Sequence, residues 1–304
     1  MGFIINPYSF VAPGPVAITD NKAVSKSITT GSSNLIKISD TNGNFNFTEL
    51  TPFTVSFWVR AGWSSSLNTN IHFFHSNQTG STGTRNEMFR IYYNESNNRL
   101  FAEFGHNNSN YRQNFWLFHS PSGNYNTARV AAGLYTGSGT GGASTYWSAT
   151  NRGNVGDDNF TMITLALSGT DSAASAHMTA YWNAASLGVG FYVNGRNVGN
   201  PAMDGDQDRQ IAIGSNVANE AKSGNNTNTV YNDLTIWDKQ LSATEVSELY
   251  NNGTRLDATT HSCASNLKGY YTFEASNGND SSGNGAPAFT VGGDSSIISI
   301  WIII

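Results

Sequence analysis

The sequence predicts an all-β protein, an antiparallel β-sandwich with one short helix near residues 242–251. Three observations support this prediction. Charged residues make up only 12% of the 304 residues and aromatic residues another 12%, a balance typical of β-proteins with many turns. Several segments alternate apolar and polar residues with a period of two, as half-buried strands do. Asn194-Gly195, between two apolar segments, is the strongest short signal for a two-residue hairpin.

The first core strand is expected at residues 53–60, and the next two form a hairpin. In the first, four apolar side chains occupy alternate positions and therefore share one face: Phe53, Val55, Phe57 and Val59. Residues 89–93 and 100–104 show the same alternation on either side of turn-forming residues. Further strands are expected at 160–167, 190–193, 196–198, 211–214 and 233–237.

One helix is expected to interrupt the strands. Ser242 and Glu245 have the spacing of a capping box, and Leu241 and Val246 fall where a hydrophobic staple would join them. Asn252-Gly253 provides the stop signal. These signals predict about two and a half turns of helix.

Length and charge limit the possible functions. The chain is expected to form one domain over residues 1–304, with its core at about 20–255, and residues 107–158 as a long excursion of it. The net charge is -5 and no cluster of Lys and Arg stands out, which argues against nucleic acid as a partner. No apolar stretch reaches the ~20 residues of a membrane span. Cys263 is the single cysteine, so no intrachain disulfide can form.

Four segments carry a resemblance to a known fold family. Residues 211–214 and 231–253 resemble the closing part of laminin-G-like and pentraxin-like domains of the concanavalin A-like superfamily. Residues 53–60 are similar to an early core strand of that family, and Phe191 to Gly195 (FYVNG) to one of its hairpins. The resemblance implies an antiparallel jelly-roll sandwich.

A second resemblance involves the ends of the chain. Residues 3–10, 255–267, 269–274 and 280–283 are similar to segments of laminin-G-like proteins encoded by tailed bacteriophages. This implies a virion component, with the terminal segments 1–19 and 256–304 packing on the core or on neighbouring subunits.

The superfamily includes glucan hydrolases, but their motif is absent here. Retaining hydrolysis needs two carboxyl groups about 5 Å apart, which an ExDxxE strand provides. No such strand occurs, and Glu87, Glu95 and Glu103 are spaced eight residues apart without an intervening Asp. The sequence also contains no G-x-S-x-G motif. A non-enzymatic protein is therefore expected.

One carboxylate cluster suggests a metal. Asp204, Asp206 and Asp208 offer hard oxygen ligands suited to calcium. The alternative is a solvated turn, since Asn216, Val217 and Ala218 stand where the pentraxin resemblance implies acidic ligands.

One aromatic stretch suggests a glycan site. Tyr146 and Trp147 offer rings, and Asn151 and Arg152 offer polar groups nearby, the combination that a pyranose requires. The alternative is that these rings anchor a long loop to the core.

The last residues form the most apolar stretch of the sequence. As a strand, Ile297–Ile304 would place Ile298, Ile300, Ile302 and Ile304 on one face, and Ile297, Trp301 and Ile303 on the other. Both faces then need cover. We expect this strand to insert into a neighbouring subunit; the alternatives are burial in its own domain and a membrane contact.

Together these features predict a non-enzymatic virion structural protein, such as a capsid decoration, fibre or tail component. It would assemble as a homo-oligomer, contact other virion proteins and add adhesion to host surface glycans. The alternative is a calcium-dependent carbohydrate-binding lectin that is not part of a particle. The expected location is the virion.

Overall fold

The strands form two antiparallel sheets. The computed structural model describes residues 22–26, 36–41, 43–45, 51–62, 70–78, 88–94, 99–105, 112–116, 160–169, 178–189, 209–214, 228–291 and 296–299. The larger sheet has the order β10 (Ala185–Val189), β9 (Met178–Trp182), β8 (Thr161–Leu167), β3 (Phe53–Gly62), β12 (Asn228–Trp237), β1 (Lys22–Lys26) and β15 (Ser296–Ser299); β13 (Leu267–Tyr271) also pairs with β12. The second has the order β14 (Thr290–Val291), β2 (Ile36–Asp40), β11 (Arg209–Ile213), β4 (Asn70–Gln78), β5 (Met88–Asn94), β6 (Arg99–Gly105) and β7 (Arg112–Trp116).

The chain crosses between these sheets as it proceeds. The strands β2, β3 and β4 lie alternately in the second, the larger and the second sheet, which is the crossing pattern of a jelly roll. The predicted antiparallel jelly-roll sandwich is therefore confirmed, and the described residues include the predicted short helix near residues 242–251. The predicted hairpin is also present, since β5 pairs with β6 from Asn94 opposite Arg99 to Met88 opposite Gly105.

The space between the sheets holds the main core. The four side chains predicted to share a face of β3 are each at most 1% exposed and belong to this core. Facing residues from the second sheet include Phe74 of β4 and Phe89 of β5, whose rings lie 5.8 Å apart. The period-two pattern therefore identified the inward face of β3 correctly.

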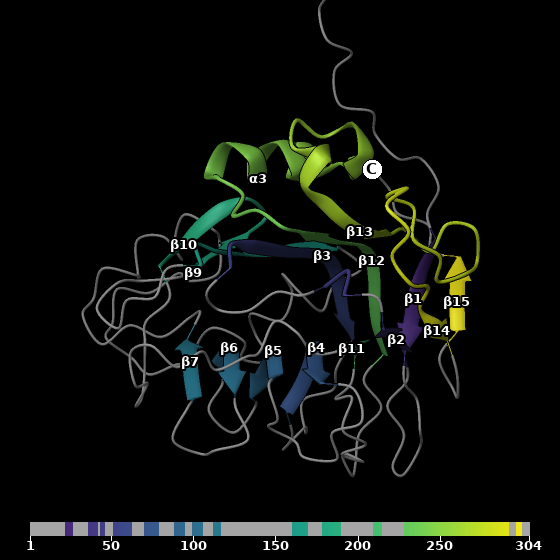
Figure 1. The fold of residues 1–304 in the computed structure, drawn as a ribbon, viewed down its shortest axis with the longest axis horizontal. Helices are drawn as coiled ribbons and strands as arrows, with labels where there is room; N and C mark the ends of the chain where they lie inside the picture. The colour runs from purple at the N-terminus through teal and green to yellow at the C-terminus, as the bar shows by residue number, and fades with distance from the viewer. Residues whose placement is uncertain are drawn as a thin grey trace, which may run out of the picture.

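A second apolar cluster covers the outer face of the larger sheet. The helix α3 (Ala243–Tyr250) and three short 3₁₀ turns, η2 (Asn251–Gly253), η3 (Ala258–Thr260) and η4 (Ala264–Asn266), lie over this face (Figure 1). Val246 and Leu249 of α3 pack with Trp58 and Trp237 of the sheet, and Tyr250 stacks on Trp58. The result is a three-layered arrangement of helix and turns, larger sheet and second sheet (Figure 1).

The predicted capping box of α3 is confirmed. The Ser242 side chain accepts a hydrogen bond from the Glu245 backbone N–H, and the Glu245 carboxylate accepts one from the Ser242 N–H. The helix ends at Tyr250, one residue before the left-handed cap Asn251. Within the described ranges, no helix is long and apolar enough to cross a membrane.

A β-bulge in β12 divides this strand into two halves. Opposite β3, the register shifts by one residue between Asn232 and Thr235, and Asp233 adopts a positive φ of 44°. Before the bulge β12 pairs with β1, and after it with β13. The extra residue lets Tyr231 and Leu234 both face the main core, while Asp233 is left unpaired in the ladder.

The Asp233 carboxylate forms a buried ion pair with Arg255. The Arg255 guanidinium donates to both Asp233 oxygens and also to Glu274. The Tyr270 hydroxyl lies 3.2 Å from the same Asp233 carboxylate. Arg255 and Asp233 are only 3% and 5% exposed, so this pair ties the segment after α3 to the sheet.

We predict that Arg255→Met strongly destabilises the fold. The change keeps the apolar stem but leaves the buried Asp233 carboxylate without its cation, which costs about 3–5 kcal/mol of unfolding free energy. Urea unfolding followed by tryptophan fluorescence would measure it. The control is Lys268→Met, which removes the exposed ion pair between Lys268 and Asp238 and should cost at most about 1 kcal/mol. Equal, small losses in both variants would contradict the prediction.

Candidate functional site

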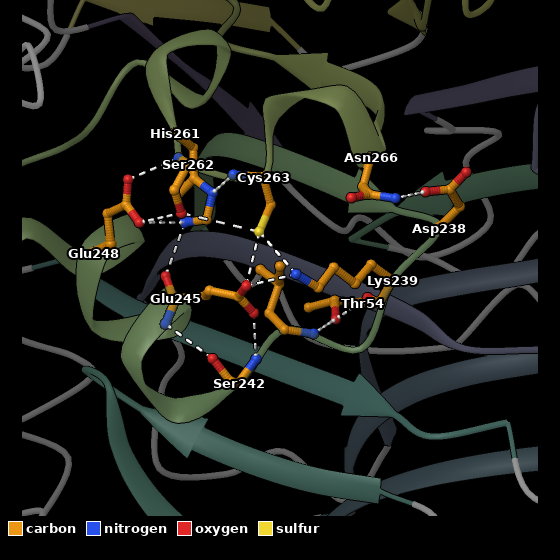
Figure 2. A network of polar contacts seen from close by, with 11 residues as sticks. Thr54, Asp238, Lys239, Ser242, Glu245, Glu248, His261, Ser262, Cys263 and Asn266 are labelled. Atoms are coloured by element: carbon orange, nitrogen blue, oxygen red, sulfur yellow. Dashed lines mark hydrogen bonds and ion pairs between the residues drawn. The ribbon is translucent and has the colours of Figure 1, made fainter. Parts of the chain in front are cut away.

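The first turn of α3 carries a carboxylate that serves three partners. One oxygen of Glu245, Oε2, completes the capping box at 2.7 Å from the Ser242 nitrogen. The other, Oε1, accepts from the Lys239 ammonium at 2.5 Å and from the Cys263 thiol at 2.8 Å. Figure 2 shows these groups converging between α3 and the turn that contains Cys263. The capping box therefore fixes the position of the Glu245 carboxylate.

Lys239 is held in this cluster through its backbone. The hydroxyl of Thr54, on the outer face of β3, donates to the Lys239 carbonyl at 2.6 Å and accepts from the Leu241 N–H at 2.9 Å. Thr54 is fully buried. The Lys239 side chain extends from this anchor and places its Nζ 3.0 Å from the Cys263 sulfur.

His261 has a structural role beside the thiol. Its Nδ1 accepts from the Cys263 backbone N–H at 3.0 Å, and its Nε2 lies 2.9 Å from the Glu245 carbonyl, to which it donates in the matching tautomer. The ring centroid is 4.9 Å from that of Trp237. Because both ring nitrogens are occupied by backbone groups, His261 is not placed to act as a base for Cys263.

The charges of this cluster stabilise one another. Burial acts to raise the pKa of Glu245, but hydrogen bonds from Cys263, Lys239 and Ser242 outweigh it and lower this pKa to about 2. Hydrogen bonds with Cys263 and Glu245 raise the pKa of Lys239 above its ordinary value. The pair is therefore ionised throughout the neutral range.

An open depression of about 600 Å³ lies near this cluster. A volume of this size suits a small organic ligand. Its base is apolar and buried, and its rim is polar. It is lined by Gly43, Asn44, Phe45, Thr51, Pro52, Phe53, Ile236, Trp237, Asp238, Ser265, Leu267, Lys268 and Asn284.

The rim carries several hydrogen-bonding groups held in place by the fold. The Asp238 carboxylate accepts from Asn266 at 2.9 Å and from the Lys268 ammonium at 2.8 Å. Asn284 donates to the Leu267 carbonyl at 2.5 Å. A carboxylate oxygen can accept a second bond and an ammonium has three donors. Asp238 and Lys268 therefore keep capacity for a ligand, and both are partly exposed.

Most of the site residues predicted from the sequence lie outside the residues that the structure describes. The predicted calcium ligands Asp204, Asp206 and Asp208, and the predicted glycan residues Tyr146, Trp147, Asn151 and Arg152, lie outside the described residues. The same holds for Ile300, Trp301, Ile302 and Ile304. Among the residues that the structure does describe, no group of three or more His, Cys, Asp or Glu could hold a metal ion.

Ile298 lies within the described part of the last strand. It belongs to β15, where it stands opposite Ala23 of β1 in the same chain. Among the strands that the structure describes, β15 is the outermost of its sheet. Its pairing with β1 is thus intramolecular, and the predicted role of Ile298, Ile300 and their neighbours in assembly stays a prediction.

Sequence reasoning missed both the thiol cluster and the depression. Lys239 and Cys263 are separated by 24 residues, and no motif links them. The one available signal was the capping box, because it fixes Glu245 at the start of the helix. The depression draws its lining from five separate stretches of chain, a juxtaposition that local patterns do not encode.

Comparisons with known proteins give only distant likenesses. No protein-family model and no curated protein matches the sequence. Among solved structures, a putative carbohydrate-binding protein from Bacteroides ovatus has a TM-score of 0.47 at 10% identity, covering 93% of this chain and 61% of that one. Botulinum neurotoxin type C has a TM-score of 0.43 at 14% identity, covering 78% of this chain and 44% of that one. The heptameric pentraxin of Limulus polyphemus has a TM-score of 0.34 at 12% identity, with 78% and 79% covered.

The chain thus spans less than half the length of the neurotoxin chain that it resembles. At these levels of similarity the function of those proteins does not carry over. The functional case rests on the geometry of the site itself.

We predict that Glu245→Gln lowers stability in a pH-dependent way. At neutral pH the loss should be about 2 kcal/mol, since hydrogen bonds to a charged group disappear. The pKa of Glu245 is about 2 in the fold against an ordinary 4.5, so its contribution is complete above pH 4.5 and is lost as the pH falls toward 2. Urea midpoints of both proteins between pH 7 and pH 3 would test this. A difference that stays constant over that range would contradict the assignment.

Proposed function

We propose that this jelly-roll sandwich is a non-enzymatic binding module for a hydroxyl-rich saccharide, and that the depression lined by Asp238, Ser265, Lys268 and Asn284 is the binding site. The observation that carries the proposal is the combination of an open volume of about 600 Å³ with a polar rim over an apolar base. Saccharides need that combination, because their hydroxyls require paired donors and acceptors while their ring faces are apolar.

The rim chemistry supports a neutral sugar. Asp238 and Lys268 neutralise each other at 2.8 Å, so the site offers donors and acceptors without a strong net field. Pro52 is exposed at the same rim and supplies an apolar surface for C–H groups of a sugar ring. The aromatic residues at the base are buried, and they shape the depression without stacking on the ligand.

The proposal also states that the protein does not hydrolyse the saccharide that it binds. The thiol of Cys263 is bound to Glu245 and Lys239, and His261 is occupied by backbone groups. Neither arrangement provides the two separated carboxyl groups that glycoside hydrolysis requires.

We predict that Ser265→Tyr weakens saccharide binding. Ser265 is exposed and lines the depression, so a phenol ring there fills the site and should weaken binding at least about tenfold, or by about 1.4 kcal/mol. A glycan array probed with the full chain identifies a bound glycan, and titration calorimetry then compares the variants. Ser247→Tyr, on the exposed surface of α3, is the matched control and should bind as the wild type does.

Two outcomes of that experiment count against the proposal. If no glycan on the array is retained, or if Ser265→Tyr binds a retained glycan unchanged, the depression is not a saccharide site. Binding that is lost on adding EDTA and unaffected by Ser265→Tyr would instead favour the calcium-dependent lectin, with Asp204, Asp206 and Asp208 as ligands.

A second proposal concerns the setting in which this module acts. We propose that it is a structural component of a virion, assembled as a homo-oligomer through its last strand. The observation that favours it is the position of β15 at the end of its sheet, because an outermost strand has backbone groups available to pair with another chain. The apolar residues Ile300, Trp301, Ile302 and Ile304 continue directly from that strand.

We predict that truncation after Asp294 converts an oligomer into a folded monomer. Light scattering coupled to size exclusion would give the solution mass of full-length and truncated protein, and far-UV circular dichroism would check that the truncated chain is folded. A full-length chain that is already monomeric would contradict the assembly role. Truncation that unfolds the chain would identify the last strand as a core element of its own domain.

A further inference from the structure

Lys239, Cys263 and Glu245 bring an amine, a thiol and a carboxylate into direct contact. The Lys239 Nζ is 3.0 Å from the Cys263 sulfur, and Glu245 Oε1 is 2.8 Å from that sulfur and 2.5 Å from Nζ. The three groups come from the linker after β12, the turn before η4 and the first turn of α3. Figure 2 shows all three side chains pointing into the same space.

The backbones that carry these groups are fixed. Thr54 holds the Lys239 carbonyl, the Asn266 N–H donates to the Cys263 carbonyl at 2.8 Å, and the capping box holds Glu245. The amine and the sulfur are therefore held at contact distance and do not depend on a chance encounter. Such preorganisation is what makes an intramolecular reaction fast.

A small reagent can reach this cluster from the Lys239 side. The side chains of Lys239 and Glu245 are 37% and 19% exposed, whereas Cys263 as a whole is 7% exposed. Cys263 itself is therefore nearly buried, and the exposed side of the cluster is the side of Lys239. Oxidants attack a cysteine sulfur in its thiolate form, and the Glu245 carboxylate in contact with Cys263 can accept the thiol proton.

We propose that this cluster is an oxidative modification site, at which hydrogen peroxide links Cys263 covalently to Lys239. In the first step Glu245 accepts the thiol proton, the sulfur attacks one peroxide oxygen and the O–O bond breaks. Glu245 then passes the proton to the departing hydroxide, which leaves as water, and Cys263 becomes a sulfenic acid. In the second step the Lys239 ammonium releases one proton to solvent, and the resulting amine attacks the sulfur. The displaced hydroxide takes a second proton from the nitrogen and leaves as water. The product is an S–N bond, so the thiol and the amine lose two hydrogen atoms in total while peroxide is reduced to water.

The two steps differ in speed. The raised pKa of Lys239 keeps it an ammonium, which helps the first step but leaves little free amine for the second. The sulfenic acid should therefore appear first and the linked product later. The link would close a covalent loop from residue 239 to residue 263, and α3 is part of that loop. Thiols that attack the sulfur would open it again.

Peptide mapping of the peroxide-treated protein tests the proposal. The full-length chain is treated with hydrogen peroxide, digested and analysed by mass spectrometry. We expect a pair of joined peptides containing Lys239 and Cys263, two hydrogen atoms lighter than their sum, that is absent before treatment and is lost after dithiothreitol. Dimedone added at early times should trap Cys263 as sulfenic acid and prevent the link.

Two lysine variants provide the matched comparison. Lys239→Arg keeps the positive charge beside Glu245 but has no reactive amine; it should lose the joined peptide completely and retain dimedone-reactive Cys263. Lys268→Arg, which alters the neighbouring exposed lysine, should form the link as the wild type does. Far-UV circular dichroism checks that both variants are folded.

Three results would overturn the proposal, and two of them need no variant. The wild type could keep Cys263 reduced under peroxide, or oxidise it to sulfenic and sulfinic acid without a joined peptide. A joined peptide that persists in Lys239→Arg would assign the link to another amine. A failure of saccharide binding would leave this inference untouched, because it does not rest on the depression.

Discussion

The outer layer of this protein depends on the bulge in β12. By inserting Asp233 as an extra residue with positive φ, the bulge moves a carboxylate out of the ladder and into contact with Arg255. The same irregularity separates the part of β12 that pairs with β1 from the part that pairs with β13. Without a partner for Asp233, a buried charge would remain on the sheet. The segment after α3 therefore supplies the positive charge that the buried Asp233 carboxylate of the sheet requires.

The candidate sites follow from how that segment is attached. Arg255 ties its start to β12, His261 ties its middle to α3, and Asn266 ties η4 to Asp238. Each attachment is local, yet together they bring the thiol of Cys263 to Lys239. They also set η4 and β13 beside residues 43–45 and 51–53, and the depression lies between these parts. The packing of this segment on the sheet therefore determines both the polar contacts of the thiol cluster and the shape of the depression.

How much of this could be read from the sequence depends on how local each signal is. The inward face of β3 and the capping box of α3 follow from side-chain period and from a four-residue motif, and both were predicted correctly. The β9–β10 hairpin was missed because its turn residues, Asn183 and Ala184, adopt positive φ with an alanine that gives no turn signal. The bulge at Asp233 and the contact between Lys239 and Cys263 depend on partners far along the chain, which no window of sequence contains. The predicted calcium and glycan residues lie outside the described part of the chain and stay predictions.

The elements of the outer layer, α3 and β13, lie late in the sequence, and this affects folding during synthesis of the chain. Trp58 and Met162 emerge from the ribosome long before α3 and β13, which cover them in the finished fold. Until residues near 270 are synthesised, the large apolar side chains of Trp58 and Met162 lack this cover. The strand β3 also lacks its partner β12, which follows about 170 residues later in the chain. Nascent chains with such a surface are prone to associate wrongly. We therefore expect biosynthesis to be the step at which this fold most needs chaperones.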